Sequence, residues 1–217
     1  MIITKTLTTL ALFFMFLGSF SFALAGQEAS TYEMPILSGV GGDFTAIDSN
    51  GKNIKFSDYK GKTVVLAFGY TNCADICPFT LGYLKQLYSK LSREEQNKTH
   101  FIFVTIDPEY DTPEHLKAFV EFFNTDFIGL SGTKKQIETI TSLYKAEYSD
   151  LSEGKVSTKS IRRTTPQKSA DSDEKASLFS HTVVLYLIDK EGNTRSLEYT
   201  GTPKDEFANK IRELIHE

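Results

Sequence analysis

The sequence has no strong excess of either charge, and it lacks long apolar runs outside its N-terminal segment. Its 217 residues carry a formal net charge of −4 with a pI near 5.7, so a basic surface for nucleic acid is not expected. Past the N-terminal segment no apolar run is long enough to cross a membrane, and internal repeats are not found. The length of the chain is enough for one domain with a full hydrophobic core, and that is the expectation.

Cysteine is scarce, and its placement is the most informative feature of the chain. Only Cys73 and Cys77 are present, four positions apart, between an apolar run and Pro78. Two thiols held this close can close a disulfide, exchange one, or bind a soft metal. A purely structural disulfide is disfavoured, because a bridge across so short a loop removes little chain entropy. At the start of a helix, where backbone N–H groups favour the thiolate, the thiol pKa values are expected to be lowered.

The N-terminal segment predicts export. Lys5 precedes an uncharged, largely apolar stretch from 6 to 27 that contains the small-residue pattern Ala23-Leu24-Ala25, so a signal peptide cut after Ala25 is expected. An uncleaved membrane anchor is the alternative, since about 20 apolar residues span a bilayer. No cysteine stands directly after the stretch, which argues against a lipid-modified N-terminus. In an oxidising compartment a free dithiol must be kept reduced, be capped by metal, or cycle.

Apolar patterns predict the elements of the domain. An Asn50-Gly51 turn predicts a β-hairpin. Buried strands are expected at 63–70 and 100–106, a short strand at 127–130 and a third long strand at 182–188, followed by a strand at 194–199. Helices are expected after Pro78, after Thr112-Pro113, around 137–144 and after Pro203, with Pro78 and Pro113 at first helical positions.

This order of elements predicts the domain organisation. Strands that alternate with helices, followed by a ββ hairpin and a last helix, indicate an α/β, thioredoxin-like fold with a central mixed sheet, flanking helices and an N-terminal β-hairpin. The expected domains are a signal peptide or anchor at 1–25, a tail at 26–40 and a thioredoxin-like domain at 41–217. The cysteines would then follow the carboxyl end of a central strand, where α/β sheets place their sites.

A polar segment at about 149–177 is expected to be a long mobile loop within that domain. It carries five basic residues with no acidic residue among them, and they mark either a solvated loop or a docking surface for an acidic partner. They are Lys155, Lys159, Arg162, Arg163 and Lys168.

The four histidines are not equivalent. His100, His115 and His216 are expected to be structural or peripheral. His181 precedes an apolar strand, at the position that faces the cysteine loop in a thioredoxin-like sheet. Ordinary thioredoxins keep a proline there, and their cysteine spacing is one residue shorter.

Cys73, Cys77 and His181 together offer a set of three soft donor atoms. Two thiolates and one imidazole suit copper, as Cu(I) or Cu(II), and also zinc. A structural zinc site would need a fourth protein ligand, which the spacing does not offer, so one copper ion is the expectation. Only Met34 lies beyond the first 25 residues, which excludes a methionine-rich copper shuttle.

The chain resembles the SCO/SenC family over about residues 41–215. Those proteins are thioredoxin-fold copper chaperones that help to assemble the binuclear copper centre (CuA) of cytochrome c oxidase, and the resemblance implies that Cys73, Cys77 and His181 are copper ligands. Three spaced motifs carry it. They are Gly69-Tyr70-Thr71-x-Cys73-x-Asp75-x-Cys77-Pro78, Asp107-Pro108-Glu109-Tyr110-Asp111-Thr112-Pro113, and His181 before a strand that ends Leu187-Ile188-Asp189.

Two positions depart from the family pattern, and neither removes a donor atom. Ala74 stands where the family usually has proline, and Ser180 where an aspartate commonly precedes the histidine. We expect Asp75 to orient the cysteine loop and Asp107 to stabilise the turn after its strand.

Three functions remain open at the level of the sequence. The first is a non-catalytic copper carrier that binds through Cys73, Cys77 and His181 and serves an oxidase subunit or another copper carrier. The second is a thiol–disulfide oxidoreductase in which the cysteines reduce the oxidase copper site. The third is a peroxidase-like protein, which would have no use for His181. The expected location is the periplasm, either soluble or anchored to the inner membrane by the N-terminal segment.

Overall fold

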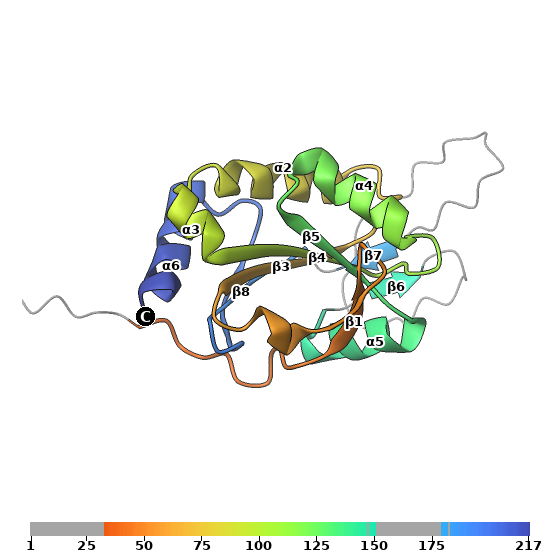
Figure 1. Ribbon diagram of the computed structural model, residues 1–217, viewed down its shortest axis with the longest axis horizontal. Coiled ribbons are helices and arrows are strands. Elements are labelled where there is room, and N and C mark those ends of the chain that lie inside the picture. The colour runs from red at the N-terminus through yellow and green to blue at the C-terminus, as the bar shows by residue number, and fades with distance from the viewer. Residues whose placement is uncertain (1–32, 147, 151–178, 182) are drawn as a thin grey trace, which may run out of the picture. The chain divides into compact units, whose positions relative to one another are not determined.

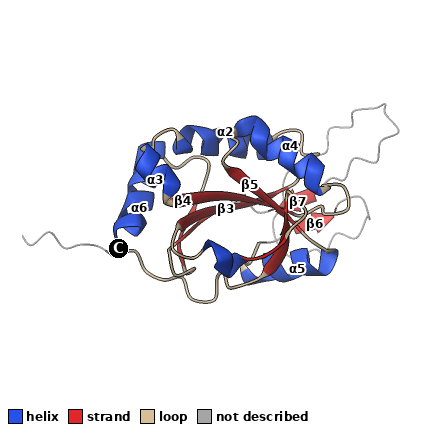
Figure 2. Cartoon of the chain, in the orientation of Figure 1, coloured by secondary structure: helices blue, strands red, loops and turns tan. Residues whose placement is uncertain are grey.

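Seven strands form a mixed sheet in the order β2-β1-β5-β4-β3-β8-β9, which confirms the predicted fold class (Figures 1 and 2). The computed structural model describes residues 33–146, 148–150, 179–181 and 183–217. The three central strands are parallel: β3 (Thr63–Gly69), β4 (Thr99–Thr105) and β5 (Phe127–Ser131). Antiparallel strands extend the sheet at both edges: β1 (Thr45–Asp48), β2 (Asn53–Lys55), β8 (Leu185–Ile188) and β9 (Thr194–Glu198).

Helices cover both faces of this sheet. In Figure 1, α2 and α4 lie above the strands and α5 lies below them. The described residues form five helices, α2 (Ile76–Tyr88), α3 (Arg93–Asn97), α4 (Pro113–Phe123), α5 (Lys134–Leu143) and α6 (Lys204–His216), and a single helical turn, η1 (Phe56–Tyr59), follows β2. Because both faces are covered, every residue of β3 is buried, as its continuous apolar run predicts. Within the described ranges no helix has the length and apolar character needed to cross a membrane.

The predicted hairpin and the predicted cap of α4 are confirmed, and α5 has a cap as well. Asp48 accepts hydrogen bonds from the backbone N–H groups of Asn50 and Lys52, both at 2.9 Å, and Gly51 supplies the positive φ of 79° that the turn requires. Thr112 caps α4 by accepting from the His115 N–H, and Thr133 caps α5 in the same way.

Two local predictions are wrong. Helix α2 begins at Ile76, so Pro78 is the third helical residue; its missing N–H costs no bond, since the first four N–H groups of a helix have no intrahelical partner. The predicted strand at 182–188 is not continuous, because its pairing with β3 ends at Leu185. Phe179–His181 instead forms β7, which pairs with β6 (Tyr148–Asp150) in a separate two-stranded sheet.

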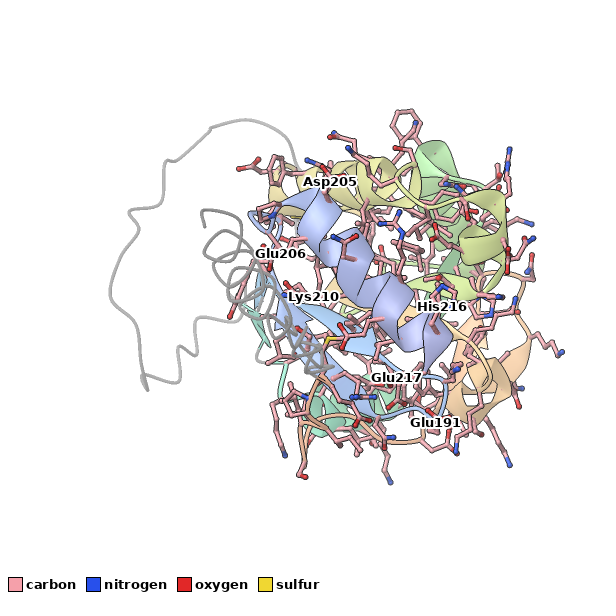
Figure 3. All side chains as sticks on the ribbon, turned by 90° about the vertical axis from the view of Figure 1, so that its left-hand side faces the viewer. Glu191, Asp205, Glu206, Lys210, His216 and Glu217 are labelled. Atoms are coloured by element: carbon pink, nitrogen blue, oxygen red, sulfur yellow. The ribbon has the colours of Figure 1, made fainter. Side chains whose placement is uncertain are left out.

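The N-terminal boundary of the domain is set by a buried arginine. The compact unit begins at Met34, within the segment that the sequence assigns to the tail, and Met34 is itself buried. The Arg195 guanidinium donates two hydrogen bonds to the Met34 carbonyl, and it forms ion pairs with Asp189 at 3.2 Å and Glu217 at 2.6 Å. Glu217 lies just past the end of α6, next to His216 (Figure 3). This one side chain therefore joins the start of the domain, the turn between β8 and β9, and the C-terminus.

The predicted signal peptide at 1–25 and the basic residues from Lys155 to Lys168 lie outside the described residues. Of the predicted loop, Ser149 and Asp150 belong to β6.

Candidate metal centre

The cysteine loop leaves the carboxyl end of β3 and enters α2, at the centre of the sheet. Cys73 lies in the loop, and its N–H donates to the Tyr70 carbonyl at 3.4 Å. Cys77 is the second residue of α2. Both cysteines are buried, at 8% and 1% residue exposure. The structure thus places both predicted sulfur donors at the edge where α/β sheets bind their ligands.

The two sulfurs are close enough to interact. A hydrogen bond with the Cys73 thiol is the largest of the effects that raise the pKa of the Cys77 thiol, and burial is the second. A backbone hydrogen bond from Tyr70 lowers this pKa, but only in part. The lowered pKa expected for Cys77 at the start of a helix is therefore wrong. The neighbouring sulfur and the apolar surroundings outweigh the backbone N–H groups of the first helical turn.

Gly69 makes room for the Cys77 sulfur. A Cβ at this last residue of β3 would lie 2.7 Å from Cys77 Sγ and 2.6 Å from Cζ of Phe103. Real Cβ atoms essentially never approach other heavy atoms this closely, so any larger residue would push the sulfur or the ring away. Gly69 is thus a requirement of the packing around the sulfur.

We expect Gly69→Ala to destabilise the protein by about 1–3 kcal/mol, because the added methyl group overfills the space between Cys77 and Phe103. Denaturant unfolding measures this. Gly82→Ala is the matched control, because Gly82 lies in α2 and a Cβ added there meets nothing within 4 Å. This variant should be more stable by up to about 1 kcal/mol, since alanine favours a helix over glycine. Equal effects of the two substitutions would contradict this packing.

A buried carboxylate lies against the other end of the loop. Asp111 is fully buried, and it accepts hydrogen bonds from the Thr71 N–H at 3.1 Å and from the hydroxyl groups of Thr71 and Thr105. Burial raises the pKa of Asp111, while these hydrogen bonds and the nearby His115 act in the opposite direction. The carboxylate links the cysteine loop to the end of β4.

The roles expected for the two other acidic residues are filled differently. Asp75 is exposed, and its side chain makes no capping hydrogen bond to α2, so the expectation that it orients the loop is not supported. The Asp107 carbonyl accepts from the Asp111 N–H at 2.9 Å, and the Asp107 N–H donates to the Thr105 hydroxyl, so its backbone takes part in the turn after β4. A turn-stabilising role of its side chain stays a prediction. Asp111 thus makes the contacts with the loop that were expected of Asp75.

His181 is placed by its backbone alone. It ends β7, where it pairs with Tyr148, and it lies four residues before β8. Its side chain is outside the described part of the chain, so its role as a ligand stays a prediction. Where side chains are described, no group of three or more histidine, cysteine, aspartate or glutamate residues is positioned to hold a metal ion.

The other histidines fit the roles expected of them. Burial, together with Lys62, lowers the pKa of His100 to about 4, and the ring packs edge-on against Tyr59 with centroids 5.2 Å apart. His115 is exposed in the first turn of α4, and His216 is exposed at the end of α6 (Figure 3).

Three residues of the site have no role in the prediction from sequence: Gly69, Thr71 and Asp111. All three lie in the motifs that carry the family resemblance. Their contacts join positions far apart in the chain, so the spacing alone does not reveal them.

Comparisons with known proteins give one consistent result. The profile of the SCO1/SenC family matches residues 36–216. The SCO2-like protein of Rickettsia felis is 32% identical over 169 residues, which cover 78% of this chain and 72% of that protein. The copper-bound ScoI of Arabidopsis thaliana is 25% identical with a TM-score of 0.66, covering 82% of this chain and 99% of that one. The copper-bound ScoI of Bradyrhizobium japonicum is 27% identical with a TM-score of 0.65, covering 81% and 99%.

Proposed function

The chain belongs to the SCO1/SenC family, and from this premise we propose that it is a copper-binding metallochaperone. It carries one copper ion, as Cu(I) or Cu(II), and delivers it to the CuA centre of cytochrome c oxidase during assembly. Cys73, Cys77 and His181 are the proposed ligands. The single observation that carries this proposal is the pair of buried, interacting thiols at the carboxyl end of β3.

The chemistry of the two thiols suits a soft metal ion. Thiolates are the ligands that Cu(I) prefers, and an imidazole completes a set of three donors. Cys73 and Cys77 would each give up a proton on binding copper as thiolates, so metal binding would release protons to solvent. Relatives with copper bound support this choice of metal.

The surface of the loop suits transfer by ligand exchange. Ala74 and Asp75 lie between the two buried cysteines and are exposed, so a protein that accepts copper can contact the loop at these two residues. Each acceptor ligand would bind copper as a ligand of this chain leaves, and the oxidation state of the ion does not change. The N-terminal segment supports export, with the domain facing the periplasm.

We expect the purified, reduced chain to bind one copper ion, since it offers a single set of soft donors. Copper analysis after reconstitution and removal of unbound metal measures the stoichiometry. A chain that binds none, or several, would count against the proposal. Delivery is tested by mixing the loaded chain with a metal-free CuA domain, separating the two proteins and analysing the copper in each.

One observation favours a second function, that of a thiol–disulfide oxidoreductase. The same contact between Cys73 and Cys77 allows the pair to close a disulfide. In that reaction a disulfide of the oxidase copper site would gain two electrons and two protons, and the pair would lose them. Counting thiols on the acceptor after mixing without copper separates this function from copper delivery.

A further inference from the structure

We propose that Asp111 is a positioning residue for the metal centre, acting on Cys73 through Thr71. Its buried carboxylate fixes the loop between β3 and α2, and it thereby sets where the Cys73 sulfur lies relative to that of Cys77. The link to copper rests on the proposed function; the effect on the geometry of the thiol pair does not.

The contacts of the carboxylate are concentrated on the loop. The Thr71 N–H lies 3.3 Å from Oδ1 and 3.1 Å from Oδ2, and the Thr71 hydroxyl donates to Oδ1. Oδ2 also accepts from the hydroxyl of Thr105, the last residue of β4. Since Thr105 pairs with Gly69 across the sheet, the carboxylate joins the residues that follow β3 to the end of the neighbouring strand.

Asp111 is itself held by its surroundings. Its N–H donates to the Asp107 carbonyl at 2.9 Å, and its carbonyl accepts from the Ser131 hydroxyl, at the end of β5, at 3.5 Å. The next residue, Thr112, caps α4. The carboxylate is therefore a fixed point, and the loop is the part that it positions.

The two cysteines depend on this fixed point to different degrees. Cys73 lies two residues from Thr71, a distance that the chain spans in at most about 7 Å. Cys77 belongs to α2 and packs against Gly69, so the helix and this packing hold its sulfur in place. Loss of the contact should therefore move one sulfur relative to the other, which is the change that a metal site or a disulfide detects.

Asp189 provides a matched control within the same sheet. It is also a buried aspartate that holds a turn, accepting from the N–H groups of Glu191 at 3.1 Å and Asn193 at 2.8 Å. It follows Ile188, which pairs with Val64 near the amino end of β3, whereas the cysteine loop leaves the carboxyl end. Asp189→Asn should lower stability, because the ion pair with Arg195 is weakened, without affecting the thiol pair.

The test compares Asp111→Asn, Thr71→Val, Thr71→Ser and Asp189→Asn in the full chain. The first readout is Cu(I) affinity by competition with a chelator. We expect a loss of about tenfold to a hundredfold for Asp111→Asn and Thr71→Val, the range for outer contacts of a metal site. Thr71→Ser keeps both donors to Asp111 and should retain the affinity. Asp189→Asn should lose stability in denaturant unfolding and keep its affinity.

The second readout needs no metal. In glutathione redox buffers Cys73 and Cys77 lose two protons and two electrons to oxidised glutathione, which becomes two reduced molecules. A freed loop lowers the effective concentration of one thiol near the other, so the disulfide becomes less stable. For Asp111→Asn and Thr71→Val we expect a tenfold change, which corresponds to a potential about 30 mV higher. Thr71→Ser and Asp189→Asn should match the parent chain.

The possible outcomes separate this inference from the proposed function. If the parent chain binds no copper but its potential shifts as expected in Asp111→Asn, the positioning role stands and the copper carrier does not. If the parent chain binds copper and Thr71→Val matches Thr71→Ser in both readouts, the positioning role is overturned. It is also overturned if Asp189→Asn changes both readouts as strongly as Asp111→Asn.

Discussion

Replacement of His181 by alanine is expected to lower the affinity for copper by more than about a hundredfold, which exceeds the effect of losing an outer contact. The physical reason is the loss of one of three donors, since the two remaining sulfurs leave the ion incompletely coordinated. The disulfide between Cys73 and Cys77 should form as before, because the imidazole takes no part in that bond. Chelator competition and thiol counting on the same samples measure the two effects.

His216→Ala is the control for this experiment, because His216 is exposed at the end of α6. It should leave copper affinity and disulfide formation unchanged. If His181→Ala keeps the full affinity for copper, the ligand assignment is wrong. The same result would favour the oxidoreductase or the peroxidase-like alternative, neither of which requires His181.

Replacement of Cys77 by serine is expected to abolish both copper binding and disulfide formation. The serine oxygen is smaller than sulfur, so it fits the space beside Gly69 without overpacking. A hydroxyl group, however, is a hard and weakly acidic donor that does not replace a thiolate on copper, and it cannot form a disulfide. Copper analysis and thiol counting measure both losses, and denaturant unfolding checks that the variant is folded.

This second variant tests the site rather than the function. Since the carrier and the oxidoreductase both need Cys77, its loss does not separate them, and His181→Ala is required for that. Full copper occupancy in a folded Cys77→Ser chain would show that the metal binds elsewhere. The assignment of the metal to this pair of thiols would then be wrong.

The central part of the fold follows from the sequence because its signals are local and strong. The runs that form β3 and β4 are continuously apolar, as expected for strands that are buried on both faces. Thr112 followed by Pro113 marks the start of α4, since a capping hydroxyl and a fixed φ both favour the first turn. The position of Cys73 and Cys77 then follows from the order of the elements.

The errors occur where tertiary contacts, rather than the local pattern, decide the outcome. The apolar pattern predicts one strand up to Ile188, but the pairing of this strand with β3 ends at Leu185. Further toward the N-terminus, Phe179–His181 pairs with β6. The pKa of Cys77 depends on the Cys73 sulfur and on burial, neither of which is encoded in the position of a residue in a helix.

The contacts that shape the candidate site are distant in the sequence. Thr71 and Asp111 are 40 residues apart, and Gly69 makes room for both Cys77 and Phe103. Motif spacing identified these residues as part of a pattern. Only the fold shows what each one contacts, and therefore what its replacement should change.

X-ray absorption of the copper-loaded chain tests the proposed ligand set most directly, because it reports the atoms bound to the ion. We predict two sulfur ligands and one imidazole nitrogen, and we expect the nitrogen contribution to disappear in His181→Ala. A spectrum without sulfur, or one that is the same with and without the imidazole of residue 181, would contradict the assignment of Cys73, Cys77 and His181 as ligands.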